Sequence, residues 1–258
     1  MDASEVLALF DCQMRRDTPA DAPGAQVERV GDVVRQVGVE GGWSAVVWSG
    51  LDQATARPAI AEQVRYFTGL GREFEWKLYS HDRPEDLGEL LLAAGFEAEP
   101  EEALMVARIA DLPEGGGLPE GVRLHPVTTP ADVELMLSAH EGAFGTTADW
   151  LRPRLLDVLA ESPGTVGMVV AMAGDTPVCG ARTELHPGTE FAGLWGGGTV
   201  PSWRGRGIYR ALVAHRAEIA AEHGYRYLTV DASDRSRPIL RRLGFAALST
   251  TTPYVYRP

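Results

Sequence analysis

The apolar positions of the chain change period several times, and these changes mark out helices and strands. In the first half, some stretches carry apolar residues every three or four positions, which favours half-buried helices. Others alternate or form short apolar runs, which favours strands. The pattern predicts helices at residues 2–17, 58–68 and 84–94, and strands at 27–39, 44–48, 73–79 and 102–109.

The second half carries a longer series of elements. The pattern predicts strands at 122–127, 165–173, 178–185, 191–200, 225–231 and 247–256, and helices at 131–142, 149–160, from 208 onward and at 236–243. Residues 111–121 between the halves are rich in Pro, Gly and Glu and have little to bury, which is typical of a linker. We therefore expect one domain at residues 1–110 and another at 122–258.

The turn between the strand at 191–200 and the next helix is the strongest chemical signal. It reads Arg204-Gly205-Arg206-Gly207 after Pro201. Glycine lets a ligand approach the backbone, and free N–H groups at a helix start attract anions, as do arginines. A diphosphate would suit such a turn, although a plain turn with solvated arginines has the same sequence.

Two other phosphate loops do not fit this turn. A Walker A loop needs Gly-Lys-Ser/Thr, but Lys77 is the only lysine of the chain. A dinucleotide fingerprint needs a third glycine where this chain has Arg210. The glycine run 196–198 in the preceding strand predicts a bulge or close approach of a ligand, with a flexible strand end against Trp195 as the alternative.

The stretch TVPSWRGRGIY at residues 199–209 resembles the acyl-CoA loop of the GNAT superfamily of N-acyltransferases, V-x-P-x-Y-R-G-x-G-x-G/A. It departs from that pattern at Tyr209, where the family has Gly or Ala. The element order after residue 121 and the stretch DxSRPILRRLGF ending at Phe245 are also similar to the family. The resemblance implies an α/β (α+β) GNAT fold, in which helices flank a mixed, mostly antiparallel sheet.

The first half repeats part of the same order of elements and motifs. The order strand, Asp-Arg, Gly-Phe occurs twice, at residues 73–79, Asp82-Arg83 and Gly95-Phe96 and again at residues 225–231, Asp234-Arg235 and Gly244-Phe245. No Arg-Gly-x-Gly turn lies between Trp48 and Phe74 in the first half. We interpret residues 1–110 as a second, smaller and degenerate GNAT-like αβ domain. Coincidence of a common αβ unit is the alternative.

The resemblance implies acetyl-CoA (coenzyme A) as the bound cofactor. It places backbone groups of Gly198, Thr199 and Val200 along the pantetheine arm, and Ser233 or Asp234 at the family's asparagine, although Asp234 also suits a helix cap. The pyrophosphate would be held by the turn itself, formed by Arg204, Gly205, Arg206, Gly207, Ile208 and Tyr209.

Candidates for proton transfer are few. The family often has a tyrosine four residues before its Gly-Phe pair, where this chain has Leu240. Tyr254 or Tyr256 on the last strand is a candidate substitute acid, although a surface or core tyrosine is the plainer interpretation. Glu184 is the candidate base, ahead of His186, Glu190 and Asp231, and a solvated glutamate is the plainer interpretation. No histidine pair has the spacing of metal ligands, so we expect no metal.

Charge and composition limit the possible partners. The net charge of −12 comes from residues 1–121, with 10 basic and 23 acidic residues, because residues 122–258 carry 14 basic and 13 acidic ones. This distribution argues against nucleic-acid binding. It permits a small polyanionic cofactor and a cationic acceptor, although an acidic half that only keeps the protein soluble is the plainer interpretation. No apolar run is long enough to span a bilayer, and two distant cysteines suggest a reducing, cytoplasmic setting.

The sequence thus predicts an N-acetyltransferase that transfers an acetyl group from acetyl-CoA to a primary amine of a small molecule, such as a metabolite or antibiotic. It would act as a monomer or homodimer, without a membrane. A protein or peptide amine, a longer acyl donor, and a non-catalytic acyl-CoA sensor or interaction module stay open as alternatives.

Overall fold

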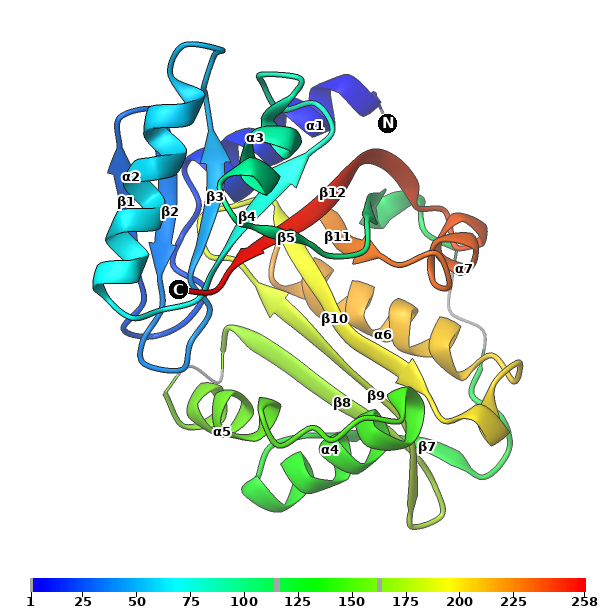
Figure 1. The fold of residues 1–258 in the computed structure, drawn as a ribbon. Helices are drawn as coiled ribbons and strands as arrows, with labels where there is room; N and C mark the ends of the chain where they lie inside the picture. Colours follow the sequence, from blue (N-terminus) through cyan, green and yellow to red (C-terminus); the bar gives the residue numbers. More distant parts are fainter. Residues whose placement is uncertain (1, 114–116, 162–163) are drawn as a thin grey trace. The chain divides into compact units, whose positions relative to one another are not determined.

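The computed structural model describes residues 2–113, 117–161 and 164–258 (Figure 1). They form two compact units. Unit 1 comprises the residues up to Met105 together with Asp231–Ile239 and Ala246–Pro258, and unit 2 comprises Val106–Val230 and Leu240–Phe245. No helix among the described residues is both long and apolar enough to cross a membrane.

The two units do not follow the contiguous division into residues 1–110 and 122–258. The last strand, β12 (Ala246–Tyr256), belongs to unit 1, where it pairs with β4 (Phe74–Tyr79). The expected linker at 111–121 includes residues 114–116, which lie outside the described residues.

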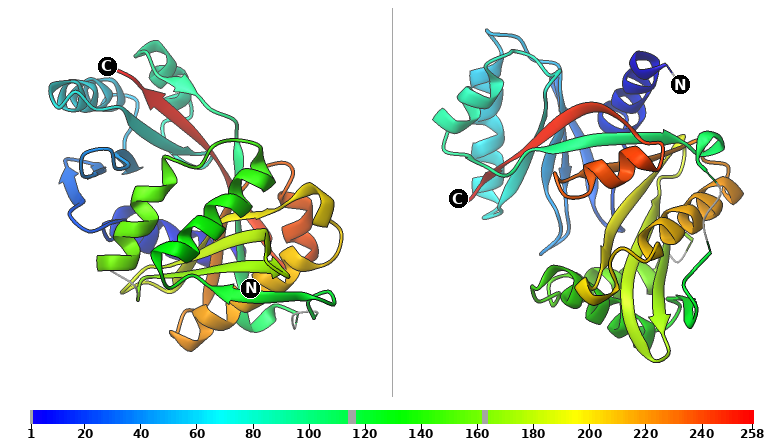
Figure 2. Two further views of the ribbon diagram at one scale, coloured as in Figure 1. Left: turned by 90° about the horizontal axis from the view of Figure 1, so that it is seen from below. Right: turned by 90° about the vertical axis from the view of Figure 1, so that its right-hand side faces the viewer.

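Unit 1 is a mixed sheet in the order β1-β2-β3-β4-β12. Only the β3–β4 pair is parallel. Helices α2 and α3 cover one face, as the views in Figure 2 show, around a core that includes Ile60, Phe67 and Trp76. Its elements are α1 (Ala3–Phe10), η1 (Asp11–Arg16), β1 (Gln26–Val30), β2 (Val33–Val37), β3 (Ala45–Ser49), α2 (Ala56–Gly69), β4, α3 (Leu87–Ala93), β5 (Glu97–Ala98), the strand β6 (Glu102–Arg108), which the unit boundary divides, and β12.

Unit 2 is a sheet in the order β11-β10-β9-β8-β7, in which only β10 and β11 run parallel. Alternate residues of β8 face opposite sides. Val170 and Met172 pack with α4 and α5, whereas Val169 and Ala171 pack with α6. Its elements are η2 (Ile109–Asp111), β7 (Val122–Pro126), α4 (Pro130–Phe144), α5 (Leu151–Glu161), β8 (Val166–Ala173), β9 (Thr176–Leu185), β10 (Phe191–Thr199), η3 (Pro201–Trp203) and α6 (Ile208–Glu222). The unit boundary divides both β11 (Tyr227–Ala232) and α7 (Arg237–Arg242).

The predicted fold class is confirmed, and the departures from the predicted elements are local. The helix expected at residues 2–17 changes at Asp11 into a turn of π-helix, which carries the buried Arg15. Helix α2 begins two residues before Pro58, because the Asp52 carboxylate accepts hydrogen bonds from the N–H groups of Ala54 and Thr55 and forms a turn there.

A half-buried carboxyl group makes the stability of unit 1 depend on pH. Burial raises the pKa of Glu102 from its ordinary 4.5 to about 7, and Asp231 acts in the same direction. The folded chain therefore binds more protons than the unfolded chain between these two values, and stability falls as the pH rises through this window.

We expect Glu102→Gln to increase the free energy of unfolding at pH 8 and to leave it unchanged near pH 4. The gain is about 1 kcal/mol once solvent screening is allowed for. Urea denaturation at both pH values measures it, with the exposed neighbour in Glu101→Gln as control. An equal effect of Glu102→Gln at both pH values would contradict this account.

Candidate functional site

The parallel strands β10 and β11 of unit 2 separate soon after they meet. They pair only where Phe191–Gly193 faces Tyr227–Thr229, while β10 continues to Thr199. On its other side, the pairing of β10 with β9 shifts register between Trp195 and Gly198. The bulge predicted from the glycine run is thus confirmed, and it lies where β10 has left β11.

Glycine is required at the bulge because side chains approach it from both faces of the sheet. A Cβ at Gly197 would lie 2.9 Å from the ring of Tyr209, and a Cβ at Gly198 would lie 2.6 Å from the ring of Phe144. Tyr209 therefore turns away from the turn before α6 and lies against the bulge. The departure from the family pattern at this position is accommodated by Gly197.

The turn before α6 presents a set of backbone N–H groups. Gly205 and Gly207 have φ values of 75° and 83°, and no side chain caps the start of α6. In the described part of the chain, no N–H from Gly205 to Arg210 donates to another backbone or side-chain group. A cradle of free donors at a helix start fits a phosphate or diphosphate.

The arginines in the turn and in the first turn of α6 make different contacts. Arg204 donates to the carbonyl oxygens of Thr199 (3.0 Å) and Ala143 (2.9 Å), and so ties the turn to β10 and to the end of α4. Arg206 donates to the Ser202 carbonyl and lies over the ring of Trp203. Arg210, which sequence reasoning did not select, has its guanidinium 3.7 Å from the Cβ position of Gly207, so its charge lies over the turn.

Glu184, the predicted base, is held by two guanidinium groups. Its Oε1 accepts from Nε of Arg182 (3.1 Å) and from Arg154 (3.4 Å). His186 lies beside the same strand pair, with Nε2 3.1 Å from the Cβ position of Gly193, and burial lowers its pKa. Burial therefore favours the neutral imidazole of His186, whereas two guanidinium groups hold the Glu184 carboxylate.

A second imidazole near this cluster was missed by sequence reasoning. His140 projects from α4, and its ring centroid lies 4.5 Å from that of Phe144 and 6.5 Å from that of Trp150. Burial lowers the pKa of His140, and the charge of Arg182 lowers it further. The spacing of four between His140 and Phe144 on a predicted helix was the available signal.

Three other predicted site residues belong to unit 1. Tyr254 packs among the core residues of that unit, and its hydroxyl lies beside Gly88 of α3. Ser233 and Asp234 follow β11 and are exposed, and Asp234 forms an ion pair with Arg237 (3.4 Å) in place of a helix cap. Their roles toward the cofactor stay predictions.

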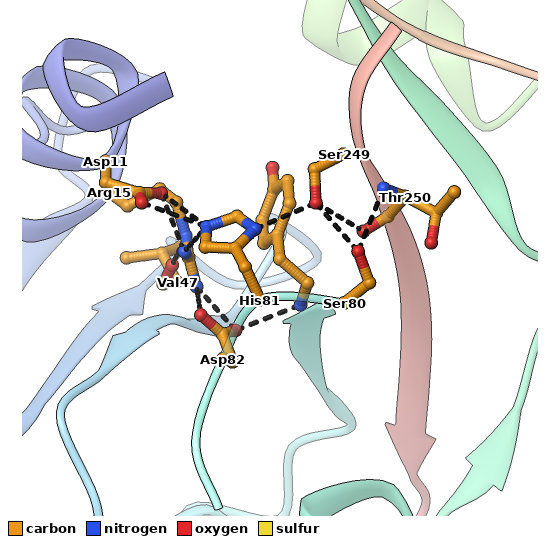
Figure 3. A network of polar contacts seen from close by, with 9 residues as sticks. Asp11, Arg15, Val47, Ser80, His81, Asp82, Ser249 and Thr250 are labelled. Carbon is orange, nitrogen blue, oxygen red and sulfur yellow. Dashed lines mark hydrogen bonds and ion pairs between the residues drawn. The ribbon is translucent and has the colours of Figure 1, made fainter. Parts of the chain in front are cut away.

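In unit 1, the side chain of Arg15 fills the position that corresponds to the separation of β10 and β11 in unit 2. Strands β3 and β4 run parallel only at Ala45–Val46. The next carbonyl, that of Val47, accepts a hydrogen bond from the buried Arg15, which also binds both carboxylate oxygens of Asp82 (Figure 3). Arg15 also stacks on Tyr79, 4.1 Å from its ring centroid.

The remainder of this network joins η1 to β12. His81 lies between Asp11 (2.9 Å) and Ser249 (2.8 Å), as Figure 3 shows. Just before α2, the carboxylate of Asp52 accepts hydrogen bonds from the N–H groups of Ala54 and Thr55. Unit 1 thus has internal contacts at both positions that correspond to the candidate site of unit 2.

A family model described as the acetyltransferase (GNAT) family matches residues 133–245, which contain the β10 bulge, the turn and α6. Residues 133–245 are a GNAT acetyltransferase domain. Proteins of this family use acyl-CoA, which agrees with a cradle for a polyanion at the start of α6. No curated protein matches the chain.

Solved structures resemble the whole chain in fold. A GCN5-related N-acetyltransferase from Kribbella flavida has a TM-score of 0.69 at 20% identity, over 99% of this chain and 94% of that chain. A GCN5-related N-acetyltransferase from Sphaerobacter thermophilus has a TM-score of 0.62 at 17% identity, over 88% and 78%. A tandem GNAT protein from the clavulanic acid biosynthesis pathway has a TM-score of 0.64 at 12% identity, over 92% and 84%.

The similarity in fold to a protein described as a tandem GNAT protein supports a two-domain layout. Within the GNAT domain, the described residues include no group of three His, Cys, Asp or Glu side chains that could hold a metal ion.

Proposed function

We propose that the GNAT domain transfers an acetyl group from acetyl-CoA to a primary amine of a small molecule. The observation that carries this proposal is the uncapped start of α6, where the N–H groups from Gly205 to Arg210 lack partners beside the bulged strand β10. Acetyl-CoA supplies an acyl group activated as a thioester. The backbone of the turn would hold its pyrophosphate, and Gly198, Thr199 and Val200 would align its pantetheine arm.

The chain's own groups supply the proton chemistry in this proposal. Amine attack needs a proton acceptor and a donor to the developing oxyanion. His140 and His186 have lowered pKa values, so both are neutral at pH 7 and able to accept a proton. Glu184 orients Arg182 and Arg154 here, and the backbone N–H groups of the β10 bulge are the candidate oxyanion donors.

The test is a calorimetric titration of the full chain with acetyl-CoA and with CoA, followed by thiol-release assays with amines. We expect one binding site per chain, because Asp52 and Arg15 fill the corresponding positions of unit 1. Two sites per chain would contradict that assignment, and no binding would contradict the proposal. Binding without thiol release from any amine would instead favour a non-catalytic acyl-CoA sensor.

A further inference from the structure

Three large aromatic side chains of unit 2 remain exposed on one side of its sheet. Trp150 is 68% exposed, Phe144 51% and Trp195 38%, although such side chains are strong candidates for burial. A cluster of exposed aromatic groups beside a polar site is a common sign of a ligand surface. We call this set the aromatic rim.

Contacts place the aromatic rim at the bulge of β10. Phe144 lies against Gly198, and the His140 ring contacts both Phe144 and Trp150. Trp195 belongs to the bulge itself, where the guanidinium of Arg182 lies 5.9 Å from its ring centroid. The rim thus borders the part of β10 that the proposed function assigns to the acyl donor.

The guanidinium group of Arg182 lies beside the same bulge of β10. Its side chain is 10% exposed, and its Nε is paired with Glu184. Its Nη1 lies 3.4 Å from the Cβ position of Gly196 in the bulge, and neither Nη group has a hydrogen-bond partner among the residues that the structure describes. The Nη atoms of Arg182 are not among the buried atoms that lack partners, so they are the accessible end of this side chain. A carboxylate is the ligand that fits two such donors best.

We propose that the acceptor is an amine that carries both a carboxylate and an aromatic ring, as an aromatic α-amino acid does. The Nη groups of Arg182 bind the carboxylate, and the aromatic rim packs against the ring. In an α-amino acid the amine is two bonds from the carboxylate, so a carboxylate held at Gly196 keeps the amine beside the bulge. This inference rests on the proposed function.

The charge of the immediate site agrees with this acceptor better than with a purely cationic one. Arg182 and Arg154 both contact the carboxylate of Glu184, and burial lowers the pKa of both nearby imidazoles, which favours their neutral forms. A positive surrounding disfavours an ammonium group and favours the neutral, nucleophilic amine. The acidic surplus of the chain lies in residues 1–121, away from these groups in the sequence.

The test compares L-phenylalanine with phenethylamine, which lacks the carboxylate, and with L-alanine, which lacks the ring. Thiol release from acetyl-CoA should show kcat/KM at least tenfold higher for phenylalanine than for either. Equal rates with phenethylamine would overturn the carboxylate assignment, and equal rates with alanine would overturn the role of the rim. Acetyl-CoA binding without turnover of phenylalanine would overturn the proposal, whereas absent acetyl-CoA binding would identify a failure of the proposed function.

Binding gives a readout that does not depend on turnover. Calorimetry of the chain with CoA and 3-phenylpropionate, which has the ring and carboxylate but no amine, should show binding that weakens at least tenfold in Arg182→Lys and in Trp150→Ala. Leu92→Ala, which changes a 50% exposed side chain of unit 1, is the control and should bind like the parent chain. Unchanged binding in both test variants, with circular dichroism confirming their folding, would contradict the proposal.

Discussion

Replacing Gly207 with aspartate is expected to abolish CoA binding while the chain stays folded. Gly207 has a left-handed backbone with φ of 83°, which aspartate tolerates better than most residues. There is room for a side chain, because the nearest atom to its Cβ position is 3.7 Å away. A carboxylate within ~4 Å of a phosphate costs about 4 kcal/mol at the effective dielectric of a protein surface, so affinity should fall by at least about 100-fold.

The matched control is Gly207→Asn, which tolerates the same backbone conformation and has nearly the same shape but no charge. Calorimetry with CoA should show a much smaller loss for the asparagine variant, and thermal unfolding without ligand should be similar for both. If the two variants lose affinity equally, shape and not charge governs the turn. The anion cradle would then be the wrong description of it.

Replacing Arg15 with methionine is expected to destabilise unit 1 by about 3–5 kcal/mol, the usual cost of leaving a buried charge without its partner. The side chains of Arg15 and Asp82 are 3% and 5% exposed, and their ion pair measures 2.7 Å. Without the guanidinium, Asp82 keeps only the N–H of Tyr79 as a hydrogen-bond donor among the described contacts, and the Val47 carbonyl loses its bond from Arg15.

Urea denaturation monitored by far-UV circular dichroism measures this loss. Adding Asp82→Asn to Arg15→Met should restore part of the stability, because the uncompensated charge is removed. The neighbouring Arg16, whose side chain is 47% exposed, serves as control in Arg16→Met and should change stability by less than about 0.5 kcal/mol. A similar effect of the two single substitutions would contradict the account of Arg15.

The sequence predicted most of the local structure because the relevant signals are local. Apolar periodicity located almost every helix and strand, and the Arg-Gly-Arg-Gly turn was identified from four adjacent residues. The pairing of β12 with β4 was not predicted, because partners about 170 residues apart leave no trace in a local pattern. Tyr254 lies on that strand, and its role as the acid stays a prediction.

The contacts of the candidate site also join elements that lie far apart in the sequence, so a local pattern could not predict them. Arg182 and His140 were not selected, because their neighbourhood depends on how α4 packs against β9 and β10. Glu184 was selected from its position before the cofactor strand, but its two arginine partners come from different elements. Tyr209 looked too large for the turn, and only the contact with Gly197 explains how it fits.

The starts of α2 and α6 differ in their source of negative charge. Asp52 belongs to the chain and always lies before α2, whereas in the proposed function the start of α6 would gain an anion only with bound cofactor. Ligand present at 100 times its Kd adds about 2.7 kcal/mol of stability, and here that gain belongs to the unit that binds it. Limited proteolysis should therefore cut unit 2 faster when CoA is scarce, so cofactor supply would govern the lifetime of the enzyme as well as its rate.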